Sequence, residues 1–336
     1  MAIDVALFND LDAAARDADR ALDRDAQPWL FDRADWFRLV QEHTPEGEPL
    51  VVRVRNGVAR CWLFLSVRGR HAEALSNWYC LRYGPIAAGA PGAKAPLEGL
   101  ASGLRRAGIT SVFLEPLAED DPLPKALRRR GWAIRRCRMN VSWRIETQGM
   151  SFDDYWASRP SKLRNTAARR ARKAKLRIAI HDGFDETAWT DYESVYEASW
   201  KPEEGSPPLI RQLAIQEGAA GTLRLGLAYS GDQPVAAQLW LVENKVATIH
   251  KLAYREDARP LSPGTVLSVE MFRRALDVDK VATIDFGIGN DAYKAEWMSH
   301  CVPLYSLSAY DMLRPAGIAG IIRSIGSKIA ARLRRR

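Results

Sequence analysis

The chain has 336 residues, 47% of them hydrophobic, and a formal net charge of +8. This length exceeds the usual size of one hydrophobic core, so we expect two domains. No run of apolar residues approaches the length that crosses a bilayer, which excludes a protein anchored by membrane-spanning helices.

The first half of the sequence predicts a mixed α/β arrangement. Its strongest local signal is Asn56-Gly57, which lies between two β-rich runs and is typical of a hairpin turn. The periodicity of apolar residues predicts helices at 13–22, 34–42, 96–107 and 124–130, and strands at 50–54, 59–67, 111–115 and 132–145.

The second half repeats this order of elements. Turns at 230–232 and 243–245 join three strands into a meander. The pattern predicts helices at 155–175, 187–199, 208–217, 265–277 and 292–298, and strands at 176–181, 223–229, 235–242, 246–254, 282–286 and 304–310. Because both halves follow the same order, an internal duplication explains them most simply.

Cysteines and histidines give no sign of a structural metal or a disulfide framework. The four cysteines are far apart and form no C-x-x-C pair, and the five histidines are equally scattered. The first 27 residues are acidic and contain no apolar segment typical of an export signal. We therefore expect a cytoplasmic protein without a metal cofactor.

The helix predicted after residue 262 has a start suited to an anion. Ser262 is a favourable N-cap, and Pro263 suits the first helical position. Gly264, Thr265 and Val266 would then hold unpaired N–H groups at the positive end of the helix. This start predicts a site for a phosphate or diphosphate of a ligand, although an ordinary capped helix has the same pattern.

The order of elements, with this helix directly after the third strand of a meander, resembles the GNAT acyltransferase superfamily. The segments YEASWKPEE, PVAAQLWLV, ATIHKLAY, SPGTVL and DFGIGNDAYKAEWM, between residues 196 and 298, resemble its Fem- and CelD-like branch. The resemblance covers residues 151–310 well and the first half in outline.

The resemblance implies an α/β fold of two tandem GNAT-like domains, each a mixed, mostly antiparallel sheet flanked by helices. We expect a degenerate domain at 1–148 that shapes the acceptor groove, an acyltransferase domain at 149–312 and a basic tail at 313–336. It also implies acyl-CoA as donor, although the loop 259–265 keeps only one glycine of the family's phosphate loop. A Fem-type relative would use an aminoacyl-tRNA instead.

By this resemblance, strand residues His250, Leu252, Ala253 and Tyr254 should line the acyl-donor arm. Asp285 ends an apolar strand where the sheet should open, so its carboxylate could accept the amine proton or could cap the next turn.

Tyr293 lies where GNAT enzymes keep the tyrosine that protonates the leaving thiolate. Its alternative is core packing with Trp297, four residues further on. Lys251 and Lys294 lie within apolar or aromatic segments and could stabilise an oxyanion or bind a substrate carboxylate. Alternatively, Lys294 extends from a helix surface into solvent.

Four further residues are candidates for substrate binding. Tyr196 and Trp200 lie beside the loop that borders the acceptor site in the superfamily, although their i, i+4 spacing also fits a buried helix face. Gln238 and Trp240 share one face of their strand, where Gln238 needs a polar partner from a substrate or from the protein backbone.

Positive charge is concentrated in two segments that contain no acid. Residues 159–177 hold nine cations and the segment after Asp311 holds seven, so the rest of the chain is acidic on balance. The first segment predicts a helix that either attracts an anionic substrate or is simply solvated. The tail predicts a basic amphipathic helix, with Ile318, Ile321, Ile322, Ile325, Ile329 and Leu333 in one stripe, suited to a membrane surface or a partner.

Three functions follow from these features. The first is transfer of an acyl group from acyl-CoA to an amine of a small molecule, sugar or peptide. The second is a Fem-like transfer from aminoacyl-tRNA to a peptide or peptidoglycan precursor. The third is a non-catalytic protein bound at a membrane surface, which would make the cytoplasmic protein peripheral to the inner membrane.

Overall fold

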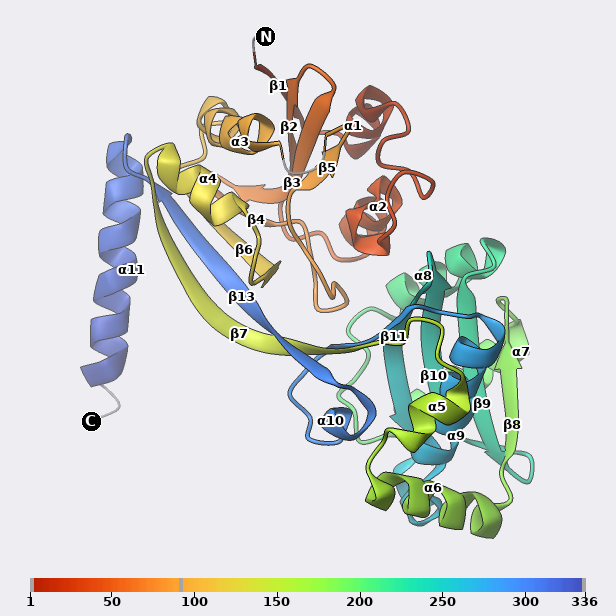
Figure 1. Ribbon diagram of the computed structural model, residues 1–336. Coiled ribbons are helices and arrows are strands. Elements are labelled where there is room, and N and C mark those ends of the chain that lie inside the picture. Colours follow the sequence, from red (N-terminus) through yellow and green to blue (C-terminus); the bar gives the residue numbers. More distant parts are fainter. Residues whose placement is uncertain (1–2, 91–92, 334–336) are drawn as a thin grey trace. The chain divides into compact units, whose positions relative to one another are not determined.

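The computed structural model of the protein describes residues 3–90 and 93–333, with side chains as far as residue 324. The chain forms two compact units. Unit 1 comprises Met1–Asn140 and Pro303–Arg336, and unit 2 comprises Val141–Val302. Each unit consists of a β-sheet flanked by helices (Figure 1), so the predicted α/β class is confirmed.

The sheet of unit 1 is mostly antiparallel, with the strand order β1-β2-β3-β4-β6-β13, and β5 pairs with β3. Its strands are β1 (Asp4–Phe8), β2 (Glu48–Asn56), β3 (Ala59–Arg68), β4 (His71–Ala74), β5 (Ile86–Ala88), β6 (Ser111–Ala118) and most of β13 (His300–Asp311). Its helices are α1 (Leu11–Ala18), η1 (Leu30–Asp32), α2 (Ala34–His43), α3 (Lys94–Arg106), α4 (Leu123–Arg129) and α11 (Pro315–Leu333).

The predicted hairpin of unit 1 is present. Asn56 pairs with Ala59, and Gly57 adopts a φ of 63°, which glycine reaches without steric cost. In the core beside it, the rings of Phe37 and Phe64 stack with centroids 4.0 Å apart. The turn residues thus set the register that places the apolar side chains of β3 against α2.

The sheet of unit 2 has the order β7-β12-β11-β10-β9-β8. Its strands are the end of β7 (Trp132–Glu146), from Val141 onward, and β8 (Arg177–His181), β9 (Leu223–Ser230), β10 (Gln233–Glu243), β11 (Val246–Tyr254) and β12 (Thr283–Ile288). Its helices are α5 (Phe152–Ala157), α6 (Ser161–Ala174), α7 (Glu186–Glu197), α8 (Pro207–Ala219), η2 (Glu256–Leu261), α9 (Pro263–Arg273), the π-helical turn η3 (Arg274–Val278) and α10 (Lys294–Trp297).

Helices cover both faces of this second sheet (Figure 1). The α9 face is identified by Gly226, where an added Cβ would lie 2.4 Å from the sulfur of Met271. The strand register places Gln238 and Leu252 beside Gly226 on that face, and places Lys251 on the opposite face, where its ammonium lies over the ring of Tyr196 in α7. The neighbouring residues Lys251 and Leu252 of β11 therefore lie on opposite faces of the sheet.

The two units exchange strands. Residues 142–146 of β7 follow the first half of the sequence, yet they pair with β12 in unit 2. Residues 304–310 of β13 come from the end of the second half, yet they pair with β6 in unit 1. Each sheet is thus completed by a strand from the other half of the sequence.

The sequence misses several elements and merges two. The short strands β1, β4 and β5 are absent from the prediction, because three to five residues give too little alternation to recognise. The single helix predicted at 155–175 is two helices, α5 and α6, separated at Pro160. Proline has no N–H to continue the helix and disfavours the helical conformation of the residue before it.

The tail begins as the predicted helix, α11, which follows a buried carboxylate. Asp311 is fully buried, and its two oxygens accept from Arg105 Nε at 2.9 Å and Nη2 at 2.8 Å. The N–H of Leu313 donates to the same carboxylate at 3.1 Å. Among the described helices, none combines the length and apolar character needed to cross a bilayer. The predicted side-chain stripe beyond Ser324 lies outside the described side chains.

Removing the Asp311 carboxylate should destabilise unit 1. Asp311→Ala leaves the largely buried Arg105 guanidinium without its counter-charge, and such a loss costs about 3 kcal/mol in the free energy of unfolding. Glu46→Ala breaks an exposed pair with Arg68 and should cost at most about 0.5 kcal/mol. Urea unfolding of both variants measures the difference in the free energy of unfolding. An equal loss in the two variants would contradict the stabilising role of the Asp311–Arg105 pair.

Candidate functional site

The sheet of unit 2 opens between β11 and β12. These parallel strands pair only over residues 246–248 and 283–285. Beyond this point β11 continues beside β10 as far as Tyr254, while β12 pairs with β7. The opening therefore begins after Thr248 and Asp285. The sequence predicts the opening at Asp285, but β12 does not end there and continues to Ile288.

The first turn of α9 differs from the predicted anion site in two respects. Ser262 is left-handed, with a φ of 53°, and its side chain makes no capping hydrogen bond. Its backbone carbonyl instead accepts from the N–H of Thr265 at 3.1 Å and of Val266 at 3.2 Å, so these two amides are not free as predicted. Among the described residues, no hydrogen bond is formed by the N–H of Gly264. One amide and the helix dipole remain for an anion.

A cavity of about 410 Å³ borders this turn. It joins the first turn of α9 to the end of β11 and to the loop before α10. Its walls include six of the predicted site residues, namely Trp200, Leu252, Tyr254, Gly264, Thr265 and Tyr293. The structure thus brings four of the nine predicted donor-binding residues and Tyr293 into one cavity.

Tyr293 immediately precedes α10, and its ring packs edge-on against Phe286 at 5.6 Å. Tyr293 is 41% exposed, whereas Trp297, which lines the same cavity, is buried. Tyr293 is therefore not a core residue like Trp297. Partial burial raises the pKa of its hydroxyl far above the ordinary value, and the charge of Asp291 adds to this. Tyr293 therefore remains a protonated phenol, able to donate a proton, at neutral pH.

Lys294 does not extend into solvent, because only 5% of the residue is exposed. Its ammonium donates to the backbone carbonyls of Phe286 at 3.2 Å and Ile288 at 2.9 Å. Burial lowers the pKa of Lys294 to about 8, although the carboxylate of Asp291 opposes the shift. An ammonium has three N–H donors, so one remains beyond the two given to the backbone.

Lys251 forms an ion pair in the interior of unit 2. Its Nζ lies 2.9 Å from Glu204 Oε1, and both side chains are largely buried. Burial lowers the pKa of Lys251, and Glu204 opposes that shift. The adjacent His250 is the extra residue of a bulge in β11, and burial lowers its pKa to about 3, so its ring is neutral at physiological pH.

Asp285 is held by the protein around it. Its Oδ1 accepts from the Ser142 hydroxyl at 2.9 Å and from the Gly287 N–H at 2.7 Å, and Arg144 approaches Oδ2 at 3.9 Å. Asp285 is not among the residues that line the cavity. Asp285 and Gly287 both lie within β12, so these contacts hold the carboxylate at the irregularity of that strand and not at a turn after it.

Gln238 and Trp240 do not contact a substrate site, which corrects their predicted role. Both are fully buried. Gln238 Nε2 donates to Ser268 Oγ at 2.8 Å and to the Gly264 carbonyl at 3.4 Å, and its Oε1 accepts from Trp240 Nε1 at 2.9 Å. The polar partner that Gln238 needs is thus α9 itself, whose first turn it positions.

The remaining predicted residues fall into two groups. Tyr196 is only 9% exposed, under the ammonium of Lys251. Trp200 is 46% exposed, and its ring contacts that of Tyr254 at a tilt of 41°, with centroids 4.2 Å apart. Ala253, Pro263 and Val266 are buried. Of the predicted aromatic pair, Trp200 is therefore the residue that lines the cavity.

Sequence reasoning missed several residues of the site. Glu204, Asp291 and Ser268 contact the predicted residues but are single polar residues in loops or in a helix interior. Leu163 of α6 also lines the cavity, because α6 lies beside α9. In the described part of the chain, no cluster of His, Cys, Asp and Glu could hold a metal ion.

Comparison with known proteins agrees with this geometry. Residues 159–295 match the family model of the acetyltransferase (GNAT) domain. No curated protein matches the chain. The match confirms the predicted resemblance to GNAT proteins and the predicted class of enzyme, an acyltransferase.

Solved structures share the fold of the whole chain. The C-terminal domain of a putative lysylphosphatidylglycerol synthetase from Agrobacterium fabrum has a TM-score of 0.59 at 15% identity, over 93% of this chain and 96% of that one. FemX has a TM-score of 0.55 at 10% identity, over 83% and 96%. A tandem GNAT protein from the clavulanic acid pathway has 0.52 at 13%, over 92% and 98%. At these identities the likeness establishes the tandem GNAT fold.

Proposed function

Because unit 2 carries a GNAT acyltransferase domain, we propose that the protein transfers an acyl group from acyl-CoA to an amine of a small-molecule, sugar or peptide acceptor. One observation carries this proposal. The first turn of α9, the separated end of β11 and Tyr293 line a single cavity of about 410 Å³. A donor anchored at α9 can therefore place its thioester beside Tyr293.

The donor would lie along the α9 face of β11. The N–H of Gly264 and the dipole of α9 would bind one phosphate group, and Leu252 and Tyr254 would contact the pantetheine arm. Gly264 suits this position, since an added Cβ would lie 3.1 Å from the ring of Tyr254. A side chain there would narrow the cavity where the donor enters.

In the proposed reaction a neutral amine attacks the thioester carbonyl directly. The C–N bond forms, the carbonyl oxygen becomes an oxyanion, and collapse of the intermediate breaks the C–S bond. The thiolate leaves with the proton of the Tyr293 hydroxyl, and the proton of the attacking nitrogen passes through water to restore the phenol. The retained proton of Tyr293 suits this role.

Lys294 would stabilise the oxyanion in this mechanism. Two of its N–H groups bind carbonyls of β12, which fixes the ammonium and directs the third donor elsewhere. A preorganised cation in a partly buried site stabilises developing negative charge more than the same cation in water. Lys251 forms an ion pair with Glu204, so it would influence the charge balance of the site and would not bind the oxyanion directly.

The role of Lys294 predicts a distinct pH dependence. The rate should fall as pH rises through about 8, because Lys294 then loses its charge. Lys294→Met should lower kcat about 100-fold or more, and Lys294→Arg should keep the cation and remove the alkaline fall. The measurement is CoA release over pH 6–10, with Lys245→Met as an exposed control.

Isothermal titration with acetyl-CoA and longer acyl-CoA separates binding from chemistry in the same proteins. The Lys294→Met variant should bind the donor within about threefold of the wild type, since the lost interaction forms in the transition state. If the wild type bound none of these donors, acyl-CoA would be excluded as the substrate.

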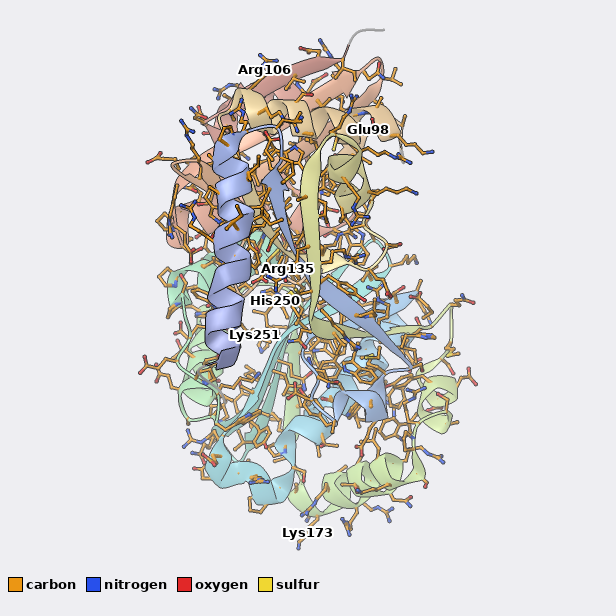
Figure 2. All side chains as sticks on the ribbon, turned by 90° about the vertical axis from the view of Figure 1, so that its left-hand side faces the viewer. Glu98, Arg106, Arg135, Lys173, His250 and Lys251 are labelled. Carbon is orange, nitrogen blue, oxygen red and sulfur yellow. The ribbon has the colours of Figure 1, made fainter. Side chains whose placement is uncertain are left out.

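A second candidate donor is aminoacyl-tRNA, which the position of α6 favours. This helix lies beside α9, and its Leu163 lines the cavity. Its cations are largely exposed, and Lys173 points away from the body of unit 2 (Figure 2). A tRNA whose 3′ end entered the cavity could place its backbone phosphates along α6.

The tRNA alternative predicts steep dependence on salt. Each phosphate contact steepens the decline of log affinity with log salt concentration by about 0.7 to 0.9. Replacing Arg169, Arg172 and Lys173 by Gln should reduce this slope by about 2. Replacing the exposed Arg68, Arg70 and Arg128 of unit 1 should leave it unchanged. Filter binding of charged tRNA measures both slopes, and an affinity that stays flat with salt would eliminate this donor.

We also propose an anionic membrane surface as a partner of α11. Ile318 and Ile322 are 40% and 63% exposed, four residues apart on the helix. Arg314 and Arg323 add positive charge, and no acid follows Asp311 in the sequence. An apolar face beside cations fits the interface of anionic lipids.

Vesicle sedimentation tests this partner. The protein should bind vesicles of phosphatidylglycerol and phosphatidylcholine, and should bind pure phosphatidylcholine at least about tenfold more weakly. The Ile318→Ser, Ile322→Ser double variant should lose most of this binding, and Val58→Ser, at an exposed apolar site of unit 1, should not. Equal binding by both variants would remove α11 from the contact.

In the described residues of unit 1, the place that corresponds to the opening of unit 2 is filled by the chain. The parallel strands β4 and β6 pair over only three residues. In residues 75–85, after β4, the N–H of Leu75 donates to the Phe64 carbonyl of β3, and Tyr83 pairs with Leu117 of β6. Tyr79, Cys80 and Tyr83 of this segment are buried, and the Tyr83 hydroxyl donates to the Phe64 carbonyl. These contacts support the proposal that unit 1 is a degenerate copy that binds no acyl donor.

A further inference from the structure

The loop between α7 and α8 places a lysine among charged groups at the opening of the sheet. The ammonium of Lys201 lies 5.7 Å from the ring centroid of Trp200, which lines the cavity. Lys201 is partly buried. Within the described part of the chain, no carboxylate lies within ion-pair distance of its ammonium.

Charge in this neighbourhood is not balanced. Lys201 lies close enough to Glu204, Lys251, Asp291 and Lys294 for each charge to affect the others. Glu204 is committed to Lys251 at 2.9 Å, and Asp291 approaches Lys294 at 3.9 Å. Asp285 also acts on Lys294, and Arg144 lies 3.9 Å from the Asp285 carboxylate. Four cations thus face three carboxylates, and within the described residues Lys201 is the cation of this group that has no carboxylate within ion-pair distance.

An uncompensated, partly buried cation costs free energy. Burial lowers the pKa of Lys201, as expected of a charge without a close counter-ion. Asp291 and Glu204 offset part of this cost, but neither carboxylate lies within ion-pair distance of the Lys201 ammonium. A ligand that supplied an anion would relieve it.

The position of Lys201 indicates which substrate brings the anion. Lys251 and its partner Glu204 lie on the α7 face of the sheet, whereas Leu252 and the first turn of α9 lie on the other face. The donor of the proposed reaction occupies the α9 face. The loop of Lys201 joins α7 to α8, and its Trp200 reaches the cavity at Tyr254. Because the donor phosphate is placed at the first turn of α9, we assign Lys201 to the acceptor.

We propose that Lys201 binds a carboxylate or phosphate group of the acceptor, so that the acceptor is an anionic amine. This inference rests on the proposed acyl transfer and adds the charge class of its second substrate. Lys201 is a binding residue in this account and takes no part in the bond changes. The amine of such an acceptor would lie between Lys201 and the reacting carbonyl.

Thermal unfolding with simple anions tests the site without requiring turnover. At constant ionic strength, inorganic phosphate or acetate should raise the Tm of the wild type saturably, by about 3 °C. The anion with the larger shift identifies the group as phosphate or carboxylate. Lys201→Gln should raise the Tm in chloride, because the unbalanced charge is gone, and should abolish most of the anion response.

Two controls make the outcome decisive. Lys201→Arg keeps the cation and should keep the response, and Lys125→Gln at an exposed site of unit 1 should behave as the wild type. A Lys201→Gln variant that matches the wild type both in chloride and in its anion response would overturn the proposal.

Repeating the titration with saturating acetyl-CoA separates acceptor from donor. An anion response that persists beside the donor supports the acceptor side, and a response that the donor abolishes would overturn that assignment. Failure of acetyl-CoA to bind at all would count against the proposed donor, while the response in its absence would still report on Lys201.

Matched amines then test the charge class in the reaction itself. Phosphoethanolamine against ethanolamine, and β-alanine against its amide, differ chiefly in the anion. The anionic member of at least one pair should have a kcat/KM about tenfold higher or more, through KM, and Lys201→Gln should remove that preference. Equal use of both members of each pair by the wild type would contradict the proposal.

Discussion

The separation of β11 from β12 is the constraint on which the site depends. Two parallel strands that stop pairing leave backbone groups that need other partners. The ammonium of Lys294 donates to the carbonyls of Phe286 and Ile288, just beyond the last residue of β12 that pairs with β11. Asp285 accepts the N–H of Gly287 at the point of separation. The lysine that stabilises the open sheet is thus the same residue that we propose as the stabiliser of the oxyanion.

The opening gives two faces of one sheet access to the same region. On one face, Gln238 fixes the first turn of α9 and leaves the N–H of Gly264 for a ligand. On the other, Lys251 and Glu204 neutralise one another beside Lys201. A two-substrate reaction needs this separation, because each substrate must reach the reacting carbonyl without occupying the space of the other.

The sequence predicts the order of elements well, because hairpin turns and apolar periodicity are local signals. Asn56-Gly57 is an example, since its conformation depends on two residues. The exchange of β7 and β13 cannot be predicted from local signals, because the residue pattern of a strand is the same whichever sheet the strand joins. Proximity in the site was predictable only through the family resemblance, which places Tyr293 near the start of α9.

Individual side chains were harder to predict, because their surroundings come from distant segments. The sequence leaves open whether Lys294 is solvated or buried, and the carbonyls that bind it belong to β12. Ser262 is a residue type favoured at N-caps, but its backbone is left-handed and its side chain makes no capping hydrogen bond. Its carbonyl accepts from the first turn of the helix. Gln238 needs a partner in either case, and only the packing of α9 on β10 identifies that partner as Ser268.

Hydrogen exchange with and without acetyl-CoA tests the central claim most directly, because it locates the donor without relying on turnover. If the donor occupies the opening, amides of residues 250–268 and 286–297 will be protected together, while peptides of unit 1 will exchange unchanged. Binding of acetyl-CoA that leaves both segments unprotected, or that protects only residues outside them, would contradict the account.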